Sequence, residues 1–206
     1  MEVELKWGLV HPGDIVHLLS SLPMPTAVLV QQNHYYSDGE GKLATAKTMV
    51  RVREEGRSLA GCTEVDRVVL TVKRRVAKER GVFRAEEVEE EIDASMWRDI
   101  LFERKTLSDL ESEALQELER SYGVDTWHPR GSLTNKRHVI ACEGFTLEVD
   151  RTTFDDGHVD AEVEVETLDI EGAKALLSRI GEEHGIEFFE QTQGKYSRFL
   201  KRRLGT

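Results

Sequence analysis

Charged residues stand at every second position along several predicted β-strands of this chain. The pattern begins at the N-terminus, where Glu2, Glu4 and Lys6 alternate with Val3, Leu5 and Trp7. Because successive side chains of a strand point to opposite faces, the charged side chains share one face and the apolar ones share the other. The apolar face must be covered by other elements. The function of the chain then depends on what the charged face meets, water or a charged ligand.

The composition is that of a globular protein. With 206 residues, of which 39% are hydrophobic, the chain is expected to form one domain over residues 1–206. A net charge of -11 argues against non-specific binding to nucleic acid or to an anionic membrane. No apolar run is long enough for a membrane span and the first residues do not resemble a signal peptide, so a cytoplasmic location is predicted. Cys62 and Cys142 lack metal-ligand spacing, and no disulfide is expected between them.

Periodicity and turn residues predict eight strands, mostly antiparallel, and several helices. Strands are predicted near residues 2–9, 26–36, 47–55, 66–75, 82–92, 133–142, 145–152 and 159–167. Helices are predicted at 12–21, 94–104, 107–122, 170–184 and 192–202. Gly and Asp residues mark the turns between them.

The charged faces differ in sign from strand to strand. Basic faces carry Arg51, Arg53 and Lys73, and acidic faces carry Glu87, Glu89, Glu148, Asp150, Glu162 and Glu164. In an open antiparallel sheet these faces would lie in water, which is the usual meaning of such alternation. An eight-stranded sheet with a right-handed twist tends to close, however, and helices packed on its outside would leave the charged faces in the interior.

A charged interior needs a ligand. Two cationic side chains about 6 Å apart repel each other by roughly 3 kcal/mol at an effective dielectric constant of about 20. Acidic rows in the same interior would need cations in turn. Carboxylates suit Mg²⁺ or Mn²⁺, and cationic side chains bind phosphoryl oxygens. The pattern therefore favours a polyphosphate that carries divalent cations.

The motif Glu2-x-Glu4-x-Lys6 resembles the Glu-x-Glu-x-Lys signature of the CYTH superfamily, the triphosphate tunnel metalloenzymes. Other segments follow in the order of that family: Tyr35–Asp38, Met49–Arg53, Leu70–Lys73, Arg84–Glu89, Asn135–Arg137, Leu147–Asp150, Glu162–Glu164 and Gly194–Tyr196. The resemblance covers nearly the whole chain and is strongest to the plant inorganic triphosphatase branch.

This resemblance implies an α+β fold, a closed eight-stranded antiparallel β-barrel or tunnel with outer helices. It implies that the phosphates are bound by Lys6, Arg51, Arg53, Lys73, Arg137 and Lys195, with Lys136 replacing Arg137 if the register shifts by one residue. It also implies one or two Mg²⁺ or Mn²⁺ ions, held by acidic residues among Glu2, Glu4, Glu87, Glu89, Asp150, Glu162 and Glu164. The predicted catalytic residues are Lys6, Glu4, Glu162 and Glu164.

The implied activity is hydrolysis of a terminal phosphoanhydride, with tripolyphosphate giving pyrophosphate and phosphate in a monomer or homodimer. A thiamine triphosphatase is an alternative, although Met49 stands where the vertebrate branch has a tryptophan that packs on the organic group. A class IV adenylyl cyclase would share the tunnel but needs base recognition, for which no motif is evident. A non-catalytic polyphosphate-binding module or a structural domain would not need the acidic rows.

Overall fold

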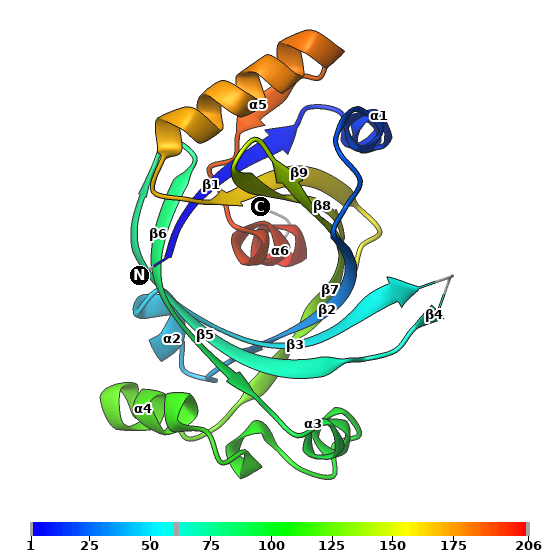
Figure 1. The fold of residues 1–206 in the computed structure, drawn as a ribbon. Coiled ribbons are helices and arrows are strands. Elements are labelled where there is room, and N and C mark those ends of the chain that lie inside the picture. Colours follow the sequence, from blue (N-terminus) through cyan, green and yellow to red (C-terminus); the bar gives the residue numbers. More distant parts are fainter. Residues whose placement is uncertain (1, 60–61, 205–206) are drawn as a thin grey trace.

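The computed structural model describes residues 2–59 and 62–204, apart from the side chains of residues 2, 58–59, 62–63, 75–78 and 204. Eight strands follow one another around a closed ring, seen along its axis in Figure 1. In spatial order they are β1 (Glu2–Leu9), β6 (Val82–Glu91), β5 (Arg67–Glu79), β3 (Thr48–Leu59), β2 (Ala27–Ser37), β7 (His128–Cys142), β8 (Phe145–Thr153) and β9 (Val159–Glu166). Pairing of β9 with β1 closes the ring, and all neighbouring strands are antiparallel. The predicted closed eight-stranded barrel is confirmed.

Helices cover the barrel from outside on two opposite sides (Figure 1). The first group consists of η1 (Pro12–Asp14), α1 (Ile15–Ser21) and α5 (Ile170–His184), and its core includes Leu5, Val149, Val163 and Leu177. The second group consists of α3 (Ala94–Leu101), η2 (Leu107–Asp109) and α4 (Glu113–Tyr122), and its core includes Val52, Leu70, Trp97 and Leu118. The apolar strand faces therefore point outward onto helices, as the alternation predicts.

The C-terminal helix α6 (Lys195–Leu204) occupies a different place, within the opening of the ring in Figure 1. Its Phe199 is fully buried and packs with Tyr35, Leu133 and Phe154 of the barrel and its β8–β9 turn. Lys195, the first residue of α6, therefore lies inside the barrel.

Several elements differ from the sequence-based expectation. The helix predicted over 107–122 is interrupted, because Ser112 caps α4 by accepting a hydrogen bond from the backbone of Leu115. Strands β3, β5 and β7 are longer than predicted, and the short elements α2 (Lys42–Thr45), β4 (Cys62–Thr63) and β10 (Phe188–Glu190) were not predicted. Cys142 has a free thiol, and the side chain of Cys62 lies outside the described residues. In the part of the chain described, no helix has the length and apolar character needed to cross a membrane.

Candidate functional site

The interior of the barrel holds a cavity of about 760 Å³. Side chains from both ends of the chain line it: Glu4, Lys6, Arg51, Arg53, Lys73, Glu87, Glu89, Arg137, Glu148, Glu164 and Lys195 are among them. They come together because the antiparallel register places the charged position of one strand beside that of the next, for example Lys6 beside Glu164. The charged faces thus surround one space.

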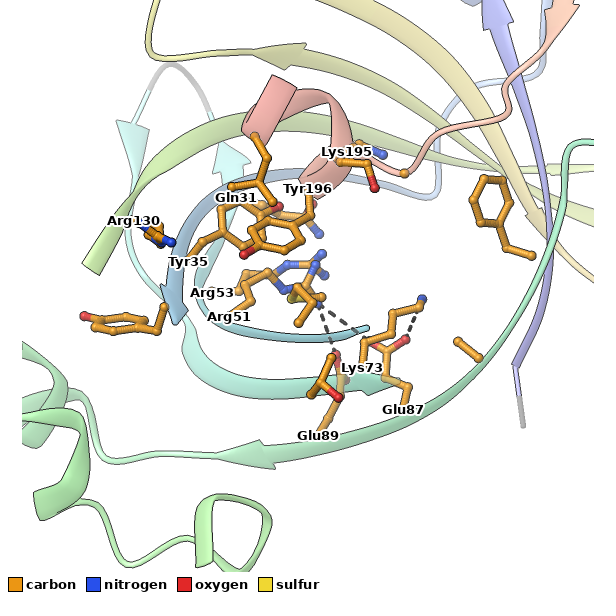
Figure 2. A pocket seen from close by; sticks show the side chains of 18 of the residues that line it. Gln31, Tyr35, Arg51, Arg53, Lys73, Glu87, Glu89, Arg130, Lys195 and Tyr196 are labelled. Carbon is orange, nitrogen blue, oxygen red and sulfur yellow. Dashed lines mark ion pairs between the residues drawn. The ribbon is translucent and has the colours of Figure 1, made fainter. Parts of the chain in front are cut away.

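One wall of the cavity is basic and is formed by β3 and β5. Figure 2 shows Arg51 and Arg53 side by side with Lys73 nearby. Arg51 Nη2 lies 3.7 Å from carboxylate oxygens of both Glu87 and Glu89, and Lys73 Nζ lies 2.8 Å from Glu87. Burial, and then the charge of Arg51, lower the pKa of Arg53 to about 10. Arg53 still carries its charge at neutral pH, and an anionic ligand would stabilise that charge.

The facing wall is acidic and is formed by β8 and β9. Asp150, Glu162 and Glu164 are almost fully buried there, and of these three Glu164 lines the cavity while Asp150 and Glu162 lie behind it. The ammonium group of Lys195 reaches into this cluster from α6, 2.7 Å from both Asp150 Oδ2 and Glu164 Oε1 and in contact with Glu162. The lysine predicted to bind phosphate therefore forms ion pairs with the carboxylates of this wall.

Arg137 and Lys6 also form ion pairs with the carboxylates of this acidic wall. Arg137 donates two hydrogen bonds to Asp150, at 2.9 and 2.7 Å, and one to Glu164 at 2.6 Å. Lys6 is buried, lies 2.7 Å from Glu4 Oε2 and donates to Glu164. Glu164 is therefore shared by three cations, Lys6, Arg137 and Lys195.

The carboxylates of the wall have opposite pKa shifts. Burial alone would raise the pKa of Glu164, but Lys195, Lys6 and Arg137 hold it well below its usual value. Burial raises the pKa of Glu4, and the neighbouring charge of Glu164 raises it further. Burial also raises the pKa of Glu148, against the charge of Arg137. At Glu4 and Glu148, burial thus outweighs the stabilisation that Lys6 and Arg137 give to the charged carboxylates.

A divalent cation would stabilise the charged form of these two carboxylates. Glu4, Glu148 and Glu164 each offer a carboxylate oxygen, and the three oxygens lie within 4.8 Å of one another. Glu4 Oε2 is buried and makes no aligned hydrogen bond. Asp150, Glu162 and Glu164 form a second such group. Cationic side chains contact both groups, Lys6 and Arg137 the first and Lys195 the second. Oxygen-only ligands are those that Mg²⁺ and Mn²⁺ prefer, so the residues present are suited to such an ion.

Acid should destabilise the protein through this cluster. Asp150 and Glu164 have lowered pKa values, so the stability they contribute is present above their unfolded pKa values and is lost as the pH falls through the folded ones. Glu4 and Glu148 have raised pKa values, so their protonation favours the folded state as the pH falls. This opposite effect occurs at a higher pH than the loss from Asp150 and Glu164. We expect the urea unfolding midpoint to decrease as the pH is lowered below about 4. A midpoint that stays constant down to pH 3 would contradict these assignments.

The structure does not bring every predicted residue into the site. Lys136 is exposed and does not line the cavity, whereas Arg137 does, because the pairing of Arg137 with Leu29 and Asp150 turns Lys136 outward. Glu87 and Glu89 lie against Arg51 on the basic wall and belong to neither group of potential metal ligands among the described residues. The side chain of Glu2 is outside the described residues.

Two site residues were missed by sequence reasoning. Glu148 was recognised as part of an acidic face but was not assigned to the metal ligands, although it shares that face with Asp150. Arg198 lies one helical turn after Lys195 and forms ion pairs with Asp160 and Glu162, at 2.8 and 2.9 Å. The three-residue spacing from Lys195 was a signal for it.

A closed barrel with cations facing carboxylates across its interior defines a tunnel-type protein. The CYTH domain model matches residues 1–193, and the chain therefore belongs to the CYTH family. No curated protein matches the chain in sequence.

Among solved structures, the chain is similar to a Hippeastrum protein described as an adenylyl cyclase, HpAC1, with a dominant triphosphatase activity. The identity is 27%, the TM-score is 0.85, and the similarity covers 100% of this chain and 97% of that one. A Bacillus halodurans protein described as an adenylate cyclase shares 22% identity over 97% of both chains with a TM-score of 0.72. A Pyrococcus horikoshii protein shares 20% identity over 98% of this chain and 100% of its own, with a TM-score of 0.62. The last two likenesses concern the fold alone.

Proposed function

We propose that this protein is a divalent-metal-dependent hydrolase of the terminal phosphoanhydride of triphosphates, with inorganic tripolyphosphate as its substrate. One observation carries the proposal: Arg51, Arg53 and Lys73 face the Glu4, Glu148 and Glu164 carboxylates across one cavity. Membership of the CYTH family and the triphosphatase activity of the Hippeastrum relative support it. The cytoplasmic location stays a prediction from the sequence.

The cations of the basic wall are suited to binding a linear chain of phosphates. Guanidinium groups bind phosphoryl oxygens through two parallel hydrogen bonds, and Arg51 and Arg53 lie next to each other on one face of β3. Lys73 adds a third charge from β5, the neighbouring strand. The bound triphosphate would relieve the repulsion between Arg51 and Arg53 and extend toward the carboxylates.

Hydrolysis of a phosphoanhydride depends mainly on positioning and on charge stabilisation. Water attacks the terminal phosphorus, the bond to the bridging oxygen breaks, and pyrophosphate leaves with that oxygen. Lys6 and Arg137 stand next to the acidic wall and can neutralise charge on the leaving oxygen or on the phosphoryl group. A carboxylate of the wall accepts the proton that the water loses.

Glu4, Glu148 and Glu164 are the residues that would hold a Mg²⁺ or Mn²⁺ ion, which would supply charge neutralisation and Lewis acidity. We keep the catalytic set predicted from the sequence, Lys6, Glu4, Glu162 and Glu164, and add Glu148. Glu162 belongs to the second group of potential metal ligands, where it contacts Lys195.

Phosphate release from tripolyphosphate, thiamine triphosphate and ATP, measured with and without Mg²⁺ or Mn²⁺, tests this function. We expect metal-dependent release from tripolyphosphate that is faster than from the other two, with one pyrophosphate formed per phosphate. Faster hydrolysis of thiamine triphosphate would instead identify a thiamine triphosphatase. Formation of cyclic AMP from ATP would identify an adenylyl cyclase. Lack of metal-dependent release from all three would leave a binding module or a structural domain.

A further inference from the structure

A row of uncharged polar side chains crosses the barrel wall beside the basic residues. Thr152 of β8, Asn135 of β7 and Gln31 of β2 are each at most 1% exposed. Thr152 donates to Asn135 Oδ1 at 2.9 Å, and Asn135 Nδ2 donates to Gln31 Oε1 at 3.0 Å. Gln31 Nε2 then donates to Glu55 Oε2 on β3 at 2.7 Å. Buried polar groups are retained at a cost unless they are satisfied, and here each one has a partner across the strands.

The row ends at a carboxylate that is already occupied. Arg67 donates to Glu55 through Nε at 2.8 Å and lies 2.7 Å from it through Nη2. Glu55 also accepts the hydrogen bond from Gln31, while Arg53 Nη1 is 4.0 Å away. Glu55 is therefore held toward Arg67, and it neutralises Arg53 only weakly.

Arg53 instead donates its short side-chain hydrogen bond to an uncharged acceptor. Its Nε donates to Asn33 Oδ1 at 3.0 Å, and Asn33 is its direct neighbour on β2 and only 2% exposed. Arg51 likewise donates to an uncharged side chain on its neighbouring strand β5, because its Nη2 donates to the hydroxyl oxygen of Thr71 at 3.0 Å. A carboxylate in either place would form a stronger, charge-assisted bond and would compete with phosphate for the guanidinium group.

We propose that Asn33 is a positioning residue that orients the Arg53 guanidinium group toward the cavity without neutralising it, and that Gln31 assists by holding Glu55 against Arg67. The inference rests on the proposed function, because it takes a triphosphate as the ligand of Arg53. It explains why an amide, and not an acid, stands beside Arg53 at a cavity lined by several carboxylates.

The Asn33→Asp variant separates this role from a merely structural one. Aspartate has nearly the same shape and keeps an acceptor oxygen for Arg53, so a structural role would be preserved. Our proposal instead predicts that the added charge weakens binding of tripolyphosphate roughly ten- to a hundredfold, in line with the strength of hydrogen bonds to charged groups. Isothermal titration calorimetry of the metal-free protein with tripolyphosphate measures this directly. In the steady state we expect KM to rise more than kcat falls.

The chain offers a matched control on the same strand. Gln32 faces the outside of the barrel, where its side chain bonds Ser132 and Thr134. Gln32→Glu adds the same charge one residue away, and its tripolyphosphate affinity should equal that of the unmodified protein. Asn33→Leu removes the acceptor altogether and should also weaken binding. If it fails to fold in a thermal unfolding assay, the aspartate variant still decides the question.

The outcomes are distinct from those for the proposed function. Unchanged tripolyphosphate affinity in Asn33→Asp, with a folded protein, would overturn the positioning role even if the unmodified enzyme hydrolyses tripolyphosphate. Weakened affinity in Asn33→Asp and unchanged affinity in Gln32→Glu would support it even if no hydrolysis occurs. Failure of the unmodified protein to bind tripolyphosphate would overturn both.

Discussion

The Glu164→Gln substitution is expected to reduce metal-dependent hydrolysis of tripolyphosphate by on the order of a thousandfold. Glu164 belongs to both groups of potential metal ligands, and it forms ion pairs with Lys6, Arg137 and Lys195. Glutamine keeps the size of the side chain but removes the charge that would hold a divalent cation and orient these three cations. Phosphate release at saturating Mg²⁺ measures the loss of turnover.

A second readout separates this effect from general damage to the protein. Binding of Mn²⁺, followed by electron paramagnetic resonance, should weaken in Glu164→Gln, because one of the carboxylates is lost. Glu86→Gln is the matched control, since Glu86 is exposed on β6 and does not line the cavity. If the Glu164→Gln variant has the same turnover and the same Mn²⁺ affinity as the Glu86→Gln control, the proposed site is wrong.

The Leu5→Asp substitution is expected to unfold the protein. Leu5 is fully buried, in the core between the barrel and the first group of helices. An unpaired carboxylate buried there costs several kcal/mol, which is comparable with the 5–15 kcal/mol that typically stabilises a whole domain. Circular dichroism and size-exclusion chromatography should show loss of the folded monodisperse protein, whereas the apolar control Leu5→Met should remain folded.

The neighbouring residue gives the contrasting result. Lys6 points into the cavity, so Lys6→Met is expected to abolish turnover while the protein stays folded. Some stability should be lost, because Lys6 contacts the buried carboxylates of Glu4 and Glu164. A folded and active Leu5→Asp variant, or an unfolded Lys6→Met variant, would contradict the assignment of inner and outer faces on β1.

The alternation of charged and apolar residues predicted the two faces of each strand. The closed barrel was predicted from the tendency of an eight-stranded sheet to close together with the resemblance to the CYTH superfamily. A period of two residues leaves no other arrangement for Leu5 and Lys6 once helices cover one side. It does not set the pairing between strands, and so Lys136 and Arg137 could not be distinguished until the register of β7 with β2 and β8 was known. The helix break before α4 was missed because a capping serine is common inside polar segments as well.

The partners of charged residues were harder to predict than their faces. Glu87 and Glu89 share an acidic row with no local sign that Arg51 and Lys73 stand beside them. The insertion of Lys195 among carboxylates depends on how α6 packs in the opening of the barrel, through Phe199. Asn33 carries no charge, and therefore the pattern of charges gave no reason to assign it to the site.

The most direct test of the charged interior is a crystal structure of the protein soaked with tripolyphosphate and Mn²⁺, with the metal located by anomalous diffraction. We predict Mn²⁺ among Glu4, Glu148 and Glu164, and phosphates against Arg51 and Arg53 inside the barrel. Ligands found only on the outer surface, with an interior that holds neither ion nor phosphate, would contradict the account.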